Sequence, residues 1–278
     1  FTQAEFEYAN FTGVTFEATA TFNAAMFFDV AEFDEATFGT EANFREARFE
    51  HDASFEGCRF AGSAAFTGVE FEGGYHEDDD AAFGDAVFEA GADFEEVEFR
   101  QAGFDDARFE GETSFNDSEF GTTHFIDAAF EGELDVSYTT FEKRATFEGT
   151  RFGEAVDAAE VRFESDACFA ETEFEATVSF RGTEFKGGAH TVDDADFKAA
   201  RFGSTADFQL VEFRHANFGS VAFEGNAMFR ESLFTDKGEF QNSRFGASAV
   251  FSRAVFVDRA DFSSCEFHDE AQIGRAHV

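Results

Sequence analysis

Phenylalanine recurs along this chain at a fixed spacing, and that spacing restricts the fold more than any other feature. From Phe16 to Phe71 the steps along this ladder alternate between 6 and 5 residues, which gives an 11-residue period in the first part of the chain. Of 50 positions on this ladder, 46 are Phe. The residue two before each position is mostly Ala and is never charged. An internal repeat of this kind indicates a solenoid.

The spacing within each repeat selects the kind of solenoid. Apolar residues two positions apart lie on the same side of an extended strand, so each segment supplies one large and one small inward residue before the chain turns. An amphipathic helix would place its apolar residues three and four apart. A coiled coil with an 11-residue repeat would need about three core positions at that spacing. The pattern therefore predicts an all-β solenoid.

The repeat resembles that of the pentapeptide-repeat family, in which Leu or Phe follows Ala by two residues with Asp or Asn between them. Matching stretches are Ala42-Asn43-Phe44, Ala92-Asp93-Phe94, Ala206-Asp207-Phe208 and Ala260-Asp261-Phe262. The resemblance implies a right-handed parallel quadrilateral β-helix, and the right hand agrees with the general rule for crossovers. We expect one domain over residues 1–278 with about 12 coils of about 22 residues. Because neither end shows a cap, we expect a fragment of a longer chain.

The residue before each Phe suggests two kinds of side. Asn or Asp stands before several of every second ladder position, as at Asn10, Asn43 and Asp93. Arg or Glu stands before many of the positions between them, as at Arg48 and Glu98. Asp and Asn can cap their own backbone in a turn, whereas long charged side chains suit flatter strands. The sides with five-residue steps form two opposite short faces. The charged residue before the Phe is mostly Glu on one short face and mostly Arg on the other. This difference indicates either cross-coil ion pairs or a partner that contacts one face.

Two twelve-residue steps interrupt the ladder, from Phe71 to Phe83 and from Phe185 to Phe197, and they share the pattern F-x-G-G-x-H-x-x-D-D-A-x-F. We predict projecting loops at 73–80 and 187–194. Three interpretations stay open: a bulge whose glycines make the turn, a partner-binding loop, and a site where His and carboxylates hold a divalent cation. The bulge is the simplest, because each loop offers a single His. The candidate partner-binding residues are Gly73, Gly74, His76, Asp79, Asp80, Gly187, Gly188, His190, Asp193 and Asp194.

The charge balance limits the setting and the partners. The chain carries 59 Asp+Glu against 20 Lys+Arg, a net charge of −39, and only four of the basic residues are Lys. This composition is typical of proteins that work in concentrated salt, so we expect the cytoplasm of a halophilic organism. No basic cluster favours direct binding of nucleic acid. No apolar run reaches about 18 residues, so this segment predicts no membrane span.

The sequence predicts no enzyme. It contains no G-x-S-x-G, its seven His show no metalloprotease spacing, and its three Cys form no disulfide framework. We can name no catalytic, cofactor-binding or metal-binding residue. We therefore predict a non-enzymatic, rigid interaction or scaffold module with an unknown protein partner, a homodimer being one option. The family resemblance implies one alternative, a DNA-mimicking regulator of a DNA-binding enzyme such as DNA gyrase.

Overall fold

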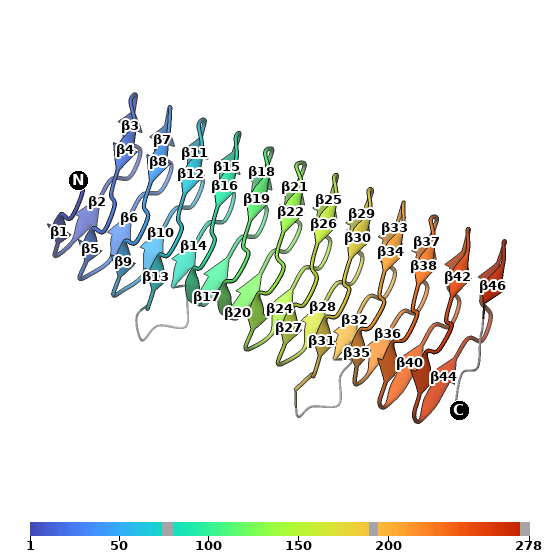
Figure 1. Cartoon of the computed structure of the whole chain (residues 1–278). Coiled ribbons are helices and arrows are strands. Elements are labelled where there is room, and N and C mark those ends of the chain that lie inside the picture. Colours follow the sequence, from blue (N-terminus) through green and yellow to red (C-terminus); the bar gives the residue numbers. More distant parts are fainter. Residues whose placement is uncertain (74–79, 189–193, 273–278) are drawn as a thin grey trace. The chain divides into compact units, whose positions relative to one another are not determined.

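The computed structural model describes residues 1–73, 80–188 and 194–272. The chain divides into two compact units, Phe1–Asp135 and Val136–Val278. Every regular element in the described residues is a short β-strand, and most strands have two residues (Figure 1).

The strands of the first unit lie two or three residues apart from their neighbours in the chain, with longer gaps at the corners. They are β1 (Glu5–Phe6), β2 (Ala9–Asn10), β3 (Thr15–Phe16), β4 (Ala20–Thr21), β5 (Met26–Phe27), β6 (Ala31–Glu32), β7 (Thr37–Phe38), β8 (Ala42–Asn43), β9 (Arg48–Phe49), β10 (Ala53–Ser54), β11 (Arg59–Phe60), β12 (Ala64–Ala65), β13 (Glu70–Phe71), β14 (Ala81–Ala82), β15 (Val87–Phe88), β16 (Ala92–Asp93), β17 (Glu98–Gly103), β18 (Arg108–Phe109), β19 (Thr113–Ser114), β20 (Glu119–His124), β21 (Ala129–Phe130) and β22 (Leu134–Asp135).

The second unit continues the same series. Its strands are β23 (Thr140–Phe141), β24 (Ala145–Thr146), β25 (Arg151–Phe152), β26 (Val156–Asp157), β27 (Arg162–Phe163), β28 (Ala167–Cys168), β29 (Glu173–Phe174), β30 (Val178–Ser179), β31 (Glu184–Phe185), β32 (Ala195–Asp196), β33 (Arg201–Phe202), β34 (Ala206–Asp207), β35 (Glu212–Phe213), β36 (Ala216–Asn217), β37 (Ala222–Phe223), β38 (Ala227–Met228), β39 (Leu233–Phe234), β40 (Lys237–Glu239), β41 (Arg244–Phe245), β42 (Ala249–Val250), β43 (Val255–Phe256), β44 (Arg259–Asp261), β45 (Glu266–Phe267) and β46 (Ala271–Gln272).

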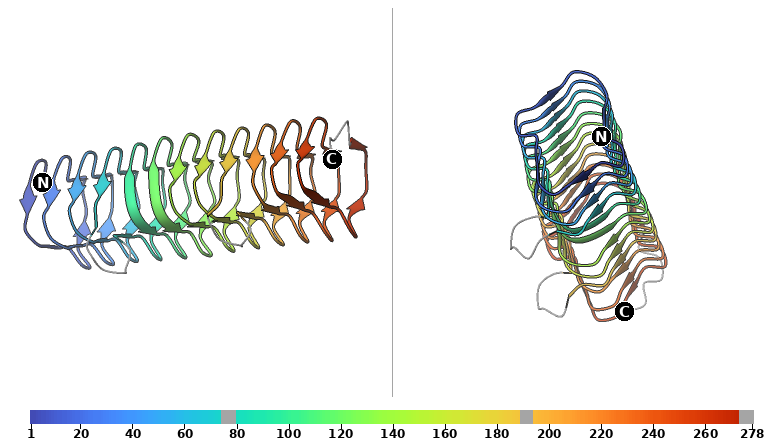
Figure 2. Two further views of the ribbon diagram at one scale, coloured as in Figure 1. Left: turned by 90° about the horizontal axis from the view of Figure 1, so that it is seen from below. Right: turned by 90° about the vertical axis from the view of Figure 1, so that its left-hand side faces the viewer.

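In most coils there are four strands, and each pairs in parallel with its equivalent in the next coil. The longer strands β17 and β20 each supply two sides of their coil. In the first unit β1 pairs with β5, β2 with β6, β3 with β7 and β4 with β8. In the second unit β27 pairs with β31, β28 with β32, β29 with β33 and β30 with β34. Figure 2 shows the coils within each unit stacked one on the next. We number the faces one to four in this chain order. The predicted all-β, parallel, four-sided β-helix is thereby confirmed.

The interior consists of stacked Phe rings. Phe22, Phe44 and Phe66 are completely buried, and their centroids follow one another at 4.8 and 4.9 Å with nearly parallel planes. Rings on different faces meet edge to face, as Phe33 and Phe44 do at 5.5 Å and 87°. Both geometries are ones that aromatic pairs prefer, because they bring the positive ring edge to the negative ring face or offset the stacked rings. The Phe ladder therefore forms the core of each unit.

A β-turn follows every second Phe. The amide of Val14 donates to the carbonyl of Phe11 at 3.0 Å, and Gly13 between them has a φ of 67°. At most turns of this kind a residue other than glycine takes the left-handed conformation, as do Glu35 and Glu46 at φ 56° and 57°. That conformation costs an L-residue about 1–2 kcal/mol. The turns are thus determined by the register of the Phe ladder more than by local preference.

The Asn and Asp residues before these turns cap them, as expected. In each case the side-chain oxygen accepts a hydrogen bond from the backbone amide two residues later. The carboxamide of Asn10 accepts from Thr12 at 3.0 Å, and the carboxylate of Asp207 accepts from Gln209 at 2.9 Å. The same bond forms at Asn43, Asp93, Asp157, Asp196, Asn217 and Asp261.

The small inward position also admits hydroxyl and thiol groups, because a carbonyl of the preceding coil can accept from them. Thr172 donates to Phe147 O at 2.9 Å, and Ser232 donates to Phe208 O at 2.9 Å. Cys58 contacts Phe33 O at 2.9 Å in the same way, and its burial raises the pKa of the thiol to about 12. Cys58, Cys168 and Cys265 are all free thiols, and the raised pKa leaves Cys58 without reactive thiolate at neutral pH.

Candidate functional site

The clearest departure from the repeat is the long corner between β31 and β32 in the second unit. Gly187 there has a φ of 65°, and a Cβ on it would lie 1.9 Å from Oδ1 of Asp194. Only glycine therefore fits at this position. Asp194, at the other end of the corner, is fully buried. The glycine and the carboxylate together bring the two ends of the inserted segment into contact.

An arginine from the next coil holds both ends of this corner. Arg214 donates from Nε to Oδ2 of Asp194 at 2.9 Å and from a terminal nitrogen to Oδ1 at 3.1 Å. The same terminal nitrogen donates to the carbonyl of Gly188 at 2.8 Å. The amide of Gly188 in turn donates to Asp166 of the preceding coil at 2.9 Å. Residues of three successive coils thus anchor the two ends of the loop.

Burial determines the electrostatics at the foot of this loop. Burial raises the pKa of Asp194 above its ordinary value of 3.8, and the hydrogen bond and charge of Arg214 oppose that rise. A buried carboxylate with a bidentate arginine partner is a fixed structural pair, because removal of the arginine would leave a charge without compensation. The arrangement anchors a loop and offers no nucleophile.

The first unit has the same device between β13 and β14, with longer contacts. Gly73 has a φ of 66°, and a Cβ on it would lie 1.8 Å from Cγ of Asp80, which is buried. Arg100 of the next coil lies 4.0 Å from Oδ2 of Asp80 and donates to the carbonyl of Glu72 at 3.4 Å. We call the two sets the loop clamps: Gly73, Asp80 and Arg100 in the first unit, and Gly187, Asp194 and Arg214 in the second.

The predicted site residues divide into two groups. Gly73, Asp80, Gly187, Gly188 and Asp194 come together at the loop bases, where the two positive φ values are those that the bulge interpretation requires. The others lie outside the described residues: Gly74, His76, Asp79, His190 and Asp193. Over residues 1–73, 80–188 and 194–272, no group of three His, Cys, Asp or Glu is placed to hold a metal ion.

Sequence reasoning missed Arg100 and Arg214. Each follows directly after the face-one Phe of the coil after a loop, in the shared sequence F-R-x-A-x-F at Phe99–Phe104 and Phe213–Phe218. In other coils this position holds residues such as Glu50, Glu142 and Glu164. Among the coils, Arg occupies this position only in the two that follow a loop. That coincidence could have predicted a contact between each arginine and its loop.

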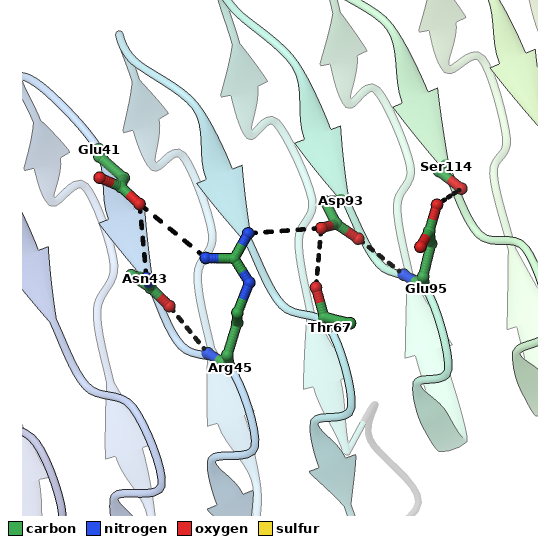
Figure 3. Close-up of polar contacts among 7 residues, drawn as sticks. All are labelled: Glu41, Asn43, Arg45, Thr67, Asp93, Glu95 and Ser114. Atoms are coloured by element: carbon green, nitrogen blue, oxygen red, sulfur yellow. Dashed lines mark hydrogen bonds and ion pairs between the residues drawn. The ribbon is translucent and has the colours of Figure 1, made fainter.

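The outer surface of face four in the first unit carries a continuous polar network (Figure 3). Asp93 accepts from Thr67 Oγ1 at 2.7 Å and from its own turn at Glu95 N at 3.1 Å, and Arg45 lies 3.7 Å from it. Glu95 accepts from Ser114 of the next coil at 3.1 Å. These bonds hold exposed carboxylates in fixed positions along the stack.

Comparison with known proteins identifies the repeat. The family model described as pentapeptide repeats (nine copies) matches at residues 22–70, 78–119 and 94–140. The chain is a pentapeptide-repeat protein. No curated protein matches it.

One solved pentapeptide-repeat structure is HetL, described as involved in heterocyst differentiation regulation in the cyanobacterium Nostoc. It is 12% identical to this chain over 96% of this chain and 90% of HetL, with a TM-score of 0.22. At that score the family assignment depends on the repeats themselves. Among the residues described, none forms a helix able to span a bilayer.

Basic side chains of these pentapeptide repeats are largely engaged in ion pairs between coils. Arg59 donates to both carboxylate oxygens of Glu89 at 2.6 and 2.8 Å, and Arg201 does the same with Glu224 at 3.0 Å for each bond. Such exposed pairs contribute about 0–1 kcal/mol each. They agree with the cross-coil explanation for the alternation of Arg and Glu between faces, and they leave the remaining surface charge strongly negative.

Proposed function

We propose that this pentapeptide-repeat protein is a non-catalytic, rigid interaction module that presents a fixed acidic surface to a basic region of a protein partner. The observation that carries the proposal is the charge of residues 82–134, where 15 Asp+Glu face only 2 Arg for a net −13. Asp93, Glu98 and Glu119 lie on short strands, and the other acids lie in the turns and connections between strands. The buried Phe stacks fix the backbone of both. Carboxylates that are already ordered lose little entropy on binding and produce a strong local field.

A basic probe tests this proposal. Poly-lysine added to the full chain in moderate salt should protect the peptides of residues 82–134 from hydrogen exchange. The peptides of 207–259, which carry a net charge of −1, should change little. The protection should fall steeply as salt increases, because screening removes the attraction. Equal protection of both regions, or protection of 207–259 alone, would refute the acidic-surface function.

Mimicry of DNA remains the second candidate, and charge density favours it. Net charge averages about 3 per coil, or about one charge per 1.6 Å of coil rise, close to the 1.7 Å of B-DNA. The charge density matches that of B-DNA only as an average over the chain. The charge density of residues 82–134 is higher than this average, and that of residues 207–259 is lower. A gyrase supercoiling assay with the full chain in potassium salt decides this candidate: inhibition at micromolar protein supports it, and unchanged supercoiling eliminates it.

We propose that the protein acts in the salt-rich cytoplasm of a halophilic organism. Its high acid content and its scarcity of Lys support this proposal. Screening there would allow an acidic surface to approach partners that dilute buffer would keep apart.

A further inference from the structure

The second unit carries a cluster of outward apolar side chains that the repeat does not require. Met228 and Val250 point outward from β38 and β42 on face four and are direct cross-strand neighbours. Leu233 and Val255 do the same on face one, in β39 and β43. Because face one follows face four around a turn, the two pairs lie on either side of one corner.

Two more apolar residues extend this cluster. Leu210 lies at the tip of a turn, and the turn that contains Arg230 is its equivalent in the next coil. The amide of Leu210 donates to the carbonyl of Arg230 at 3.1 Å. The side chain of Leu210 is 45% exposed. Val257 follows β43 and is 62% exposed. We call the six residues the apolar corner: Leu210, Met228, Leu233, Val250, Val255 and Val257.

Leu210 is also in an unfavourable backbone conformation, with a φ of 61°. Equivalent tips hold Gly182 and Glu160, and glycine takes this conformation without cost, whereas a bulky residue rarely does. An exposed leucine in a left-handed turn gains nothing for the fold. The ladder imposes the same conformation at the other turn tips, so the feature that distinguishes Leu210 is its exposed apolar side chain.

The charge of the surroundings is neutralised as well. Residues 207–259 hold 7 Asp+Glu and 6 Lys+Arg, a net −1 in a chain of net −39. At the corner itself Glu231 accepts from Arg253 at 2.9 Å and lies 3.3 Å from Arg230, so the charged tips compensate one another. The apolar corner therefore lies in a nearly neutral stretch of an acidic protein.

We propose that the apolar corner is the surface through which two copies of this chain associate. The charge distribution of the chain favours a second copy of the chain as the partner at this corner. Two molecules of net −39 repel wherever their acidic surfaces meet, but they do not at a corner without net charge. A basic partner would be drawn instead to residues 82–134, and an acidic partner would be repelled by most of the chain. A second copy offers the same apolar, neutral corner, and a two-fold axis brings the two into contact.

The size of the corner predicts the strength of the dimer. Six side chains are fewer than the roughly 20–30 residues that each partner gives to a standard interface, so the association is weak and concentration-dependent. It strengthens in salt, because screening reduces repulsion between the remaining charges while apolar burial persists. A contact driven by opposite charges would weaken instead. The inference goes beyond the proposed acidic surface and uses a different part of the chain.

The test is sedimentation of the full chain in about 1 M KCl and in dilute buffer, over a rising concentration. The wild type should move toward the mass of two chains in high salt. The variant Leu233→Glu/Val255→Glu should stay a monomer. Its fold should persist, because Glu184 and Glu212 already occupy the equivalent outward position in β31 and β35.

The matched control is Thr140→Glu/Thr146→Glu, which adds the same two charges to outward positions of β23 and β24 away from the corner and should dimerise as the wild type does. A wild type that remains monomeric in high salt, or a Leu233→Glu/Val255→Glu variant that dimerises unchanged, would overturn the proposal. Poly-lysine protection of 82–134 should be the same in both variants, so failure of one proposal is distinguishable from failure of the other.

Discussion

Residues 82–134 and 207–259 have the same interior and opposite surfaces. In the first stretch Phe88 and Phe109 stack at 4.7 Å, and in the second Phe223 and Phe245 stack at 5.0 Å. The net charge is −13 in the first and −1 in the second. The inward residues therefore specify the coil without help from the acids. The surface charge of the two stretches differs although their interiors are alike, and the proposed acidic-surface function rests on that difference.

The turn tips show the same contrast. In the first stretch the left-handed positions hold Asp85, Glu96, Asp106, Asp117 and Asp127, and in the second they hold Leu210, Ser220, Glu231, Asn242 and Arg253. The backbone is alike in both stretches, with φ between 55° and 63°. What varies between coils is therefore the chemistry displayed at a fixed geometry, which is what an interaction module requires.

The largest effect should come from the shared interior. Phe109→Ala and Phe223→Ala each remove a completely buried ring between two stacked neighbours, and each should lower the free energy of unfolding by about 3–5 kcal/mol. Chemical denaturation measures both. Arg108→Ser, the exposed neighbour of Phe109, should change it by less than about 0.5 kcal/mol. Similar losses for Phe109→Ala and Arg108→Ser would show that the assigned register is wrong.

A smaller effect should distinguish the two loop clamps. Arg214→Ala leaves the buried Asp194 without its bidentate partner and should cost about 1–3 kcal/mol. Arg100→Ala should cost less, because Arg100 lies 4.0 Å from Asp80. Thermal unfolding compares the two variants with Arg253→Ala, which removes only an exposed ion pair. An Arg214→Ala protein as stable as Arg253→Ala would contradict a structural role for the clamp.

The clamp also predicts a pH dependence. Because burial raises the pKa of Asp194 in the folded state, the folded protein binds that proton more tightly than the unfolded one. The contribution of Asp194 to stability therefore falls as pH rises from the ordinary value of 3.8 through the folded value. Without Arg214 the folded pKa should rise further and extend this fall to higher pH. The difference in unfolding free energy between wild type and Arg214→Ala, followed from pH 4 to 7, should grow with pH.

The smallest effect concerns the turn tips. Glu96→Gly and Leu210→Gly should each raise stability by about 0.5–1 kcal/mol, because glycine removes the left-handed cost and gives back only part of it as chain entropy. Only Leu210→Gly should also weaken self-association in the sedimentation experiment. Glu98→Gly, placed in the strand β17, should instead destabilise. A loss of stability in both tip variants would show that these side chains make contacts that outweigh the backbone strain.

Much of this architecture was predictable because the repeat is visible residue by residue. The Phe and Ala positions predicted an all-β solenoid, and the resemblance to pentapeptide repeats implied the four-sided parallel β-helix. Asn10 and Asp93 predicted the capped turns. The left-handed turns at Glu35 and Glu46 were not predictable, since glutamate has no preference for that conformation and the ladder imposes it. The loops at Gly73 and Gly187 were visible as twelve-residue steps.

The base of each loop required the structure. The sequence gives Asp80 and Asp194 as candidate partner-binding residues, but they lie buried against glycine. The arginines that contact them come from positions 20 residues later in the sequence. The apolar corner was hidden for a similar reason: Met228 and Val250 are 22 residues apart, and only cross-coil pairing makes them neighbours.

Hydrogen exchange of the full chain in dilute buffer and in about 1 M KCl tests most directly whether a common interior supports two different surfaces. In high salt the backbone amides of 82–134 and 207–259 should be protected alike, because the same Phe and Ala lattice holds both. In dilute buffer, where the Debye length is about 30 Å at 0.01 M, the stretch of net −13 should lose protection first through self-repulsion. Equal loss in the two stretches, or earlier loss in 207–259, would contradict the account.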